Sequence, residues 1–130
     1  MTVDQVVPAG ERGVTRIAER VVAKLATQAA REALRAEPAG RPPRGRSTGP
    51  HASAVVRRPS EGDGVVGIAS VRVAVELVYP SDIGAQCGAV RRQVARRVEE
   101  LASMEVRDVS VAVERLHTTA LEGAAPGRLQ

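Results

Sequence analysis

Cys87 is the residue whose chemistry would be easiest to use, because it is the only cysteine and follows a helix-start signal at Ser81 or Asp82. A thiol near a helix N-terminus can have a lowered pKa and act as a nucleophile. However, Cys87 precedes Val90 and Val94 by three and seven residues, which places it on the apolar side of the same helix. The spacing favours a small buried side chain over a catalytic thiol.

The two histidines, His51 and His117, are the next candidates. Neither has a second histidine, a cysteine or a carboxylate at the spacing of a metal site, so we interpret both as solvated side chains. The segment from Gly84 to Gly88 lacks the lysine of a P-loop and the third glycine of a dinucleotide fingerprint, and it predicts close packing of a helix on a sheet. The sequence therefore predicts no catalytic residue, no cofactor and no metal.

Arginine supplies the remaining chemistry, since the chain has 19 Lys and Arg against 15 Asp and Glu, a formal net charge of +4. A bias towards arginine can also reflect a GC-rich genome. One predicted helix carries a basic surface, namely Arg91, Arg92, Arg96 and Arg97. These cations could contact anionic lipid or phosphate, but a solvated face is favoured, and the lack of Trp and Phe on the apolar side of the helix argues against a membrane-surface helix. Further arginines lie in a Pro-rich segment without aromatic residues to stack bases, namely Arg41, Arg44 and Arg46.

A strand, a helix and a second strand must position these residues. Residues 71–79 alternate between apolar and mixed positions, which indicates a half-buried strand. Pro80 ends it, and Ser81 or Asp82 can cap a helix. The helix has an apolar stripe at spacings of three and four, formed by Cys87, Val90, Val94, Val98 and Leu101. Alternation then returns over residues 106–116 and predicts the last strand.

The first half predicts a flexible start over residues 1–12, a short strand from Gly13 to Ile17 and a helix from Ala18 to Arg35, ended by Pro38. Residues 36–52 are rich in Pro, Arg and Gly and predict a disordered insert. Residues 52–58 predict a strand, and the turn-forming residues 59–64 join it to the next strand as a hairpin. Residues 117–130 predict a flexible tail.

These elements predict one α+β domain over residues 13–116, a two-layer sandwich in β-α-β-β-α-β order. Its two helices would cover one face of a small mixed, mainly antiparallel sheet. Both clear strands are apolar on one side only, so the other sheet face stays open to water or to a partner. The side chains expected on this partner face are Arg72, Glu76, Ser110 and Glu114.

A cytoplasmic location is the expectation from three features. A single cysteine fits a reducing compartment. The start of the sequence lacks the basic and apolar regions of a secretory signal. No run of 18 apolar residues occurs, which predicts no membrane span.

The pattern resembles the alkaline shock protein family of bacterial envelope stress-response proteins. Two blocks carry the resemblance, residues 13–35 and residues 53–116. The first is a glycine leading through an isoleucine into a V-[IV]-x-K-[IL]-A helix, here Gly13, Ile17, Val21, Val22, Lys24, Leu25 and Ala26. The second ends in a methionine before a valine-rich strand, here Met104, Val106, Val109, Val111 and Val113. Tyr79-Pro80 departs from the Tyr-Gly turn of the family.

The resemblance implies a non-enzymatic interaction or scaffold protein that forms homo-oligomers. Some family members are held at the inner face of the membrane by a small membrane-protein partner, and no catalytic residue is carried over. The alternative function, motivated by the arginines, is a small basic nucleic-acid-binding module.

Overall fold

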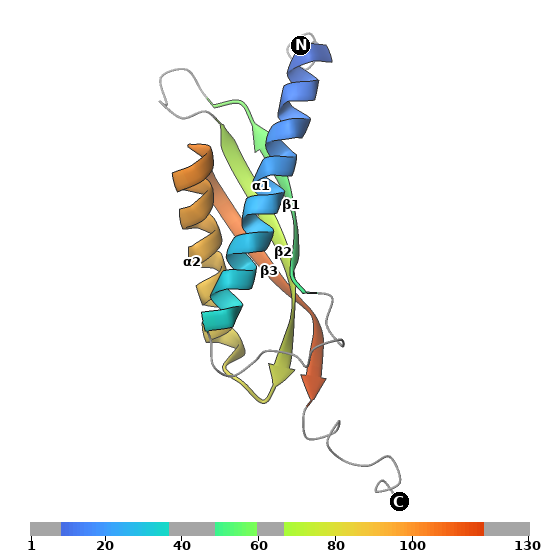
Figure 1. Ribbon diagram of the computed structural model, residues 1–130, viewed down its shortest axis with the longest axis vertical. Helices are drawn as coiled ribbons and strands as arrows, with labels where there is room; N and C mark the ends of the chain where they lie inside the picture. Colours follow the sequence, from blue (N-terminus) through green and yellow to red (C-terminus); the bar gives the residue numbers. More distant parts are fainter. Residues whose placement is uncertain (1–8, 37–48, 60–66, 119–130) are drawn as a thin grey trace, which may run out of the picture.

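Three strands form one sheet, and two helices lie side by side on the same face of it (Figure 1). The computed structural model describes residues 9–36, 49–59 and 67–118. In chain order the elements are α1 (Ala9–Ala36), β1 (His51–Arg57), β2 (Ile68–Tyr79), α2 (Ile83–Ala102) and β3 (Glu105–Thr118). The α+β class is confirmed.

The central strand is β2, which pairs with β1 antiparallel and with β3 parallel. The hairpin from β1 to β2 was expected, but the described sheet has one pair of each kind and is not mainly antiparallel. The parallel pair follows from α2, because this helical crossover returns the chain to the end of the sheet at which β2 begins.

The predicted strand from Gly13 to Ile17 is wrong, since these residues belong to α1, which already begins at Ala9. The described order is therefore α-β-β-α-β. The β-branched Val14 and Ile17 favour a strand when taken alone. With Val21 they also continue the helical spacing of three and four, and no proline interrupts the chain between Ala9 and Ala36.

The core lies between the helices and one side of the sheet. Small side chains let α1 approach closely, because four of its five buried residues are alanines. The buried stripe predicted for α2 is confirmed at Val90, Val94 and Val98, but Leu101 is 58% exposed. The side chains that β2 contributes to the core are Ala69, Val71, Val73, Val75 and Leu77.

The turn from β2 into α2 is fixed by side-chain hydrogen bonds. Asp82 is the N-cap, as predicted, and its Oδ1 accepts from the Ala85 amide at 3.0 Å. The buried Gln86 side chain reaches back, and its Nε2 donates to Ser81 Oγ at 2.8 Å and to the Asp82 carbonyl at 3.0 Å. Tyr79-Pro80 is a cis peptide bond. The start of α2, and with it the basic surface, is set by these contacts.

Each of the two edge strands, β1 and β3, has a carboxylate from a helix at its free edge. Glu19 of α1 accepts from the Val56 amide of β1 at 3.0 Å, and Glu99 of α2 lies 3.4 Å from the Val106 amide of β3. Free strand edges are templates for pairing with another chain. These two carboxylates cover one edge amide each and also tie the two layers together.

We predict that Glu19→Ala lowers the free energy of unfolding by about 1–2 kcal/mol, because the edge amide loses a charged acceptor. Glu19→Gln keeps a carbonyl acceptor and should lose clearly less. Urea denaturation measures the difference, and amide exchange at Val56 should accelerate only in the alanine variant. Equal stabilities of the two variants would contradict this role.

Candidate functional site

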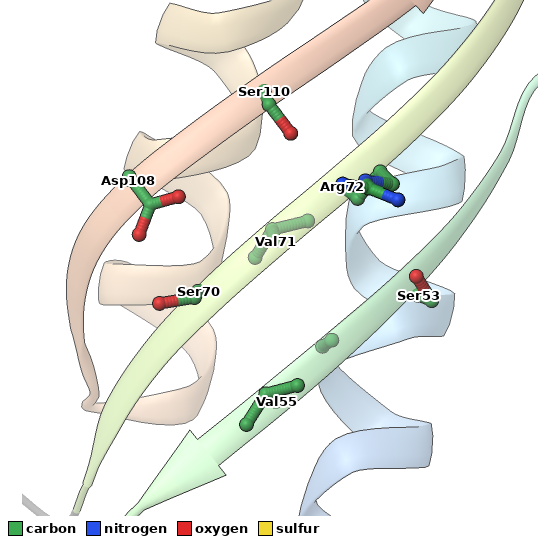
Figure 2. A pocket seen from close by; sticks show the side chains of 8 residues that line it. Ser53, Val55, Ser70, Val71, Arg72, Asp108 and Ser110 are labelled. Atoms are coloured by element: carbon green, nitrogen blue, oxygen red, sulfur yellow. The ribbon is translucent and has the colours of Figure 1, made fainter.

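The face of the sheet opposite the helices is the candidate site, because no described helix or strand lies over it. Strand pairing aligns Ser53 of β1, Arg72 of β2 and Ser110 of β3 in one row across this face. Figure 2 looks onto the face with the helices behind the sheet, and the Arg72 side chain stands between the two serines. All three residues are exposed.

Two shallow hollows adjoin this row. One has a volume of about 290 Å³ and is bordered by Val55, Ser70 and Asp108. The other has a volume of about 460 Å³ and is bordered by His51, Ala74, Ala112 and Glu114. Both include the row itself, so Arg72 separates them. The hollows exist because serine and alanine occupy most positions around a single long side chain.

The side chain of Arg72 makes no hydrogen bond or ion pair within the described part of the chain, and the same holds for the side chain of Asp108. A guanidinium offers five donors in a planar fork that suits a carboxylate. The open face therefore presents the Arg72 guanidinium, two carboxylates and three hydroxyls for contacts with another molecule, the acids being Asp108 and Glu114 and the serines Ser53, Ser70 and Ser110. This arrangement of charged and polar groups suits binding.

The structure places three of the four expected partner-face residues in the open, namely Arg72, Ser110 and Glu114. Glu114 Oε1 lies 3.6 Å from His51 Nε2, so a protonated His51 would form an exposed ion pair across the sheet. His51 starts β1 and does not lie in a disordered insert. Its solvated state is confirmed by a side chain that is 62% exposed.

Glu76 and His117 differ from expectation. His117 was predicted to be solvated at the start of a flexible tail, but it belongs to β3 and is buried. Its Nε2 lies 2.8 Å from Glu76 Oε1, and the two side chains are only 5% and 9% exposed. Glu76 points to the open side as predicted, yet it is tied into this pair. A register shift between Val75 and Glu76 places His117 beside Val78, which alternation alone could not show.

Two residues of the face were missed by sequence reasoning, Ser53 and Asp108. Ser53 could have been found, because it is the outward position between Ala52 and Ala54 in a strand that was predicted. Asp108 could also have been found, because it lies two residues before Ser110 and so on the same side of the strand. The alternation breaks only before Asp108, where a register shift between Ala69 and Ser70 makes Val106 and Asp108 partners of consecutive residues.

The basic surface of α2 is only partly available. Arg91, Arg92 and Arg96 are exposed, but Arg97 Nη2 lies 3.5 Å from Glu32 Oε2 of α1. Gln93 Nε2 also donates to Glu32 Oε1 at 3.1 Å. The pKa of Glu32 is lowered, first by the hydrogen bond from Gln93 and also by the charge of Arg97, against an opposing effect of burial. Glu32 therefore links the two helices as an anion.

Burial raises the pKa of the Cys87 thiol, although the nearby charge of Arg91 acts in the opposite direction. Cys87 packs against the core beside Val90 and Val94, as its spacing predicted. A raised pKa lowers the thiolate fraction at neutral pH and thus disfavours a nucleophile.

Over residues 9–36, 49–59 and 67–118 no group of three His, Cys, Asp or Glu side chains is placed to hold a metal ion. Neither described helix is long and apolar enough to cross a membrane. Comparison with protein-family models, with curated proteins and with solved structures finds no match.

We predict that Glu76→Ala destabilises the fold by about 1–3 kcal/mol, because it removes a hydrogen-bond partner from the buried His117 ring. Thermal unfolding at neutral pH measures the loss. Glu114→Ala is the matched control, since it removes a carboxylate from an exposed histidine on the same face and should cost under about 0.5 kcal/mol. Equal losses in the two variants would show that burial of the pair contributes nothing.

The lowered pKa of Glu32 predicts a pH-dependent link between the helices. A depressed carboxyl pKa gives stability that is fully present above the usual value of 4.5 and disappears as the pH falls through the folded-state value. The wild type should therefore exceed Glu32→Gln in melting temperature at pH 7. The gap should close on acidification to about pH 2–3. A gap that stays constant between these conditions would exclude the charged link.

Proposed function

We propose that this chain is a non-enzymatic, self-associating interaction module of a bacterial envelope stress response. In this proposal it is cytoplasmic and is recruited to the inner face of the membrane by a small membrane-protein partner. The observation that carries the interaction role is the open sheet face, where Arg72 and Asp108 are exposed and no described element packs over the hollows. The resemblance to alkaline shock proteins supports the stress-response part.

The signs of the charges favour this face for self-association. Arg72 is accompanied there by two exposed carboxylates, Asp108 and Glu114. Two copies of a surface with both signs can bring opposite charges together, whereas two copies of a uniformly basic surface repel each other. The small side chains around Arg72 also let a second sheet approach, as facing sheets pack about 10 Å apart.

The surroundings of Cys87 and His117, two side chains capable of catalysis, support a non-enzymatic role. The pKa of Cys87 is raised by burial, and His117 is buried against Glu76. Catalytic side chains are usually accessible from a cleft, but these two are built into the packing. The exposed histidine His51 has the Glu114 carboxylate as its neighbour, at 3.6 Å.

A nucleic-acid-binding module remains the alternative, and the sheet face argues against it. Sheets that bind single strands offer aromatic side chains on which bases stack. Tyr79 is the only aromatic residue in the chain, and it lies at the end of β2. Asp108 and Glu114 would also repel phosphates from this face.

We predict that the full chain forms oligomers and that Arg72→Glu weakens their association at least about tenfold, since it replaces attraction by repulsion at the centre of the face. Arg96→Glu is the matched control, because it makes the same charge change on the helical layer and should leave association intact. Sedimentation velocity over a range of concentrations, without lipid or nucleic acid, measures both.

A wild type that stays monomeric at every concentration would contradict self-association. Equal weakening by Arg72→Glu and Arg96→Glu would contradict its placement on the sheet face.

A further inference from the structure

From residue 13 onwards, the outward side of α1 carries only positive charge. Its described cations recur at spacings of four, four, seven and four residues, so they follow one side of the helix, and all are exposed; they are Arg16, Arg20, Lys24, Arg31 and Arg35. At 1.5 Å per residue the row is about 28 Å long. The row is hard to recognise in the sequence, because Arg and Ala recur close together in much of this chain.

The acidic residues of the same helix segment are turned away from this row. Glu19 accepts from the Val56 amide at the sheet edge, and Glu32 is held by Gln93 and Arg97 of α2. Between residues 13 and 36 these are the only two carboxylates. Between residues 13 and 36 the row therefore has no anion on its own side of the helix, although Arg35 at its end lies near enough to Glu32 for its charge to lower the pKa of that carboxyl.

The middle of α2 extends this surface, because α1 and α2 form one layer (Figure 1). Arg92 and Arg96 are exposed and lie roughly half a turn away from the buried stripe of Val90, Val94 and Val98. The acidic Glu99 and Glu100 follow only in the last turn of α2. We call the seven cations of the two helices the basic helical face.

Exposed aliphatic side chains border this face. Val14, Ile17 and Val21 are 68%, 61% and 45% exposed and form a stripe at spacings of three and four beside the cations. They are uncovered because α1 has 28 residues and α2 only 20, and the N-terminal end of α1 extends beyond α2 in Figure 1. Valine and isoleucine are costly to leave in water at three consecutive positions of one stripe.

We infer that the basic helical face docks on a membrane surface that contains anionic lipid. Arginine and lysine would pair with headgroup phosphates, and the aliphatic stripe would enter the boundary between headgroups and acyl chains. Cations beside exposed aliphatic residues on one helix favour this partner over a nucleic acid, whose backbone offers nothing to an aliphatic stripe. Both helices would then lie flat on the membrane, and the open sheet face would point away from it.

The binding must depend mainly on charge. The aliphatic stripe has three residues and the described helices contain no aromatic residue to anchor them in the headgroup region. Binding should therefore require anionic lipid and weaken as salt screens the surface. This inference goes beyond the proposed function, which concerns the opposite face of the molecule. The sedimentation experiment on that face contains no lipid.

The experiment is co-sedimentation of the full chain with vesicles of phosphatidylcholine alone or with about 30% phosphatidylglycerol at low salt. We expect binding to the anionic vesicles only. Arg20→Glu/Lys24→Glu should weaken it at least roughly 25-fold, at about fivefold for each cation lost. Arg57→Glu/Arg107→Glu, the matched control, reverses two exposed strand arginines and should weaken it less than about fivefold.

Two further variants separate charge from folding and from the aliphatic stripe. Arg20→Gln/Lys24→Gln removes charge without introducing repulsion and should still weaken binding by roughly tenfold or more. Val14→Ser/Ile17→Ser keeps every charge and should reduce binding to the same vesicles measurably, since polar side chains gain nothing in the interface. Circular dichroism checks that each variant is folded.

Three results would overturn the inference: equal binding to neutral and anionic vesicles, equal weakening by the helix and strand charge reversals, or tighter binding to a DNA duplex than to anionic vesicles at equal phosphate concentration. Self-association measured without lipid is unaffected by these outcomes. Failure of lipid docking and failure of the proposed function are thus distinguishable.

Discussion

The packing of one side of β2 against two helices is the interaction on which the rest of the structure depends. Val71, Val73, Val75 and Leu77 are almost fully buried, and each pairs in register with β1 or β3 through its backbone. Successive side chains of a strand point to opposite faces of the sheet. Since the helices cover only one face, every second residue of the sheet points away from them. The open face and the basic helical face are therefore consequences of the same core. One is the back of the sheet layer, and the other is the outside of the helix layer.

Side-chain contacts fix how α1 lies on the sheet and beside α2. Glu19 reaches the edge amide of Val56 in the sheet, while Glu32 is held by Gln93 and Arg97 of the neighbouring helix. Both carboxylates therefore lie on the sides of α1 that face β1 and α2. The outer side of α1 is left with cations, namely Arg16, Arg20, Lys24, Arg31 and Arg35. The charge distribution of the helical layer is a result of how α1 is joined to its neighbours.

Periodicity in the sequence predicted what depends on local patterns. The apolar side of β2 at Val71, Val73, Val75 and Leu77, the stripe of α2 at Val90, Val94 and Val98 and a cap at Ser81 or Asp82 follow from neighbours within a few residues, and the structure confirms them, with Asp82 as the cap. Tyr79 was expected on the apolar side but is 54% exposed, whereas Ala74 and Val78 on the other side are buried. The predicted strand from Gly13 to Ile17 was wrong because Val14 and Ile17 are compatible with both a strand and a helix, and only the continuation of the helix from Ala9 decides between them. The predicted burial of Leu101 was wrong because this residue lies near the end of α2, where too little packs over it. Periodicity cannot show where a neighbouring element ends.

The candidate site shows the same division between local and distant information. Arg72 and Ser110 were placed on the open face by alternation, which needs no knowledge of the partner strand. Glu76 and His117 are 41 residues apart and meet only because β2 and β3 are parallel and their register shifts at Val75. A shift of one residue changes which side chains are neighbours across the strands. The contact between Glu76 and His117 therefore depends on how the strands pair, and the residue types alone could not reveal it.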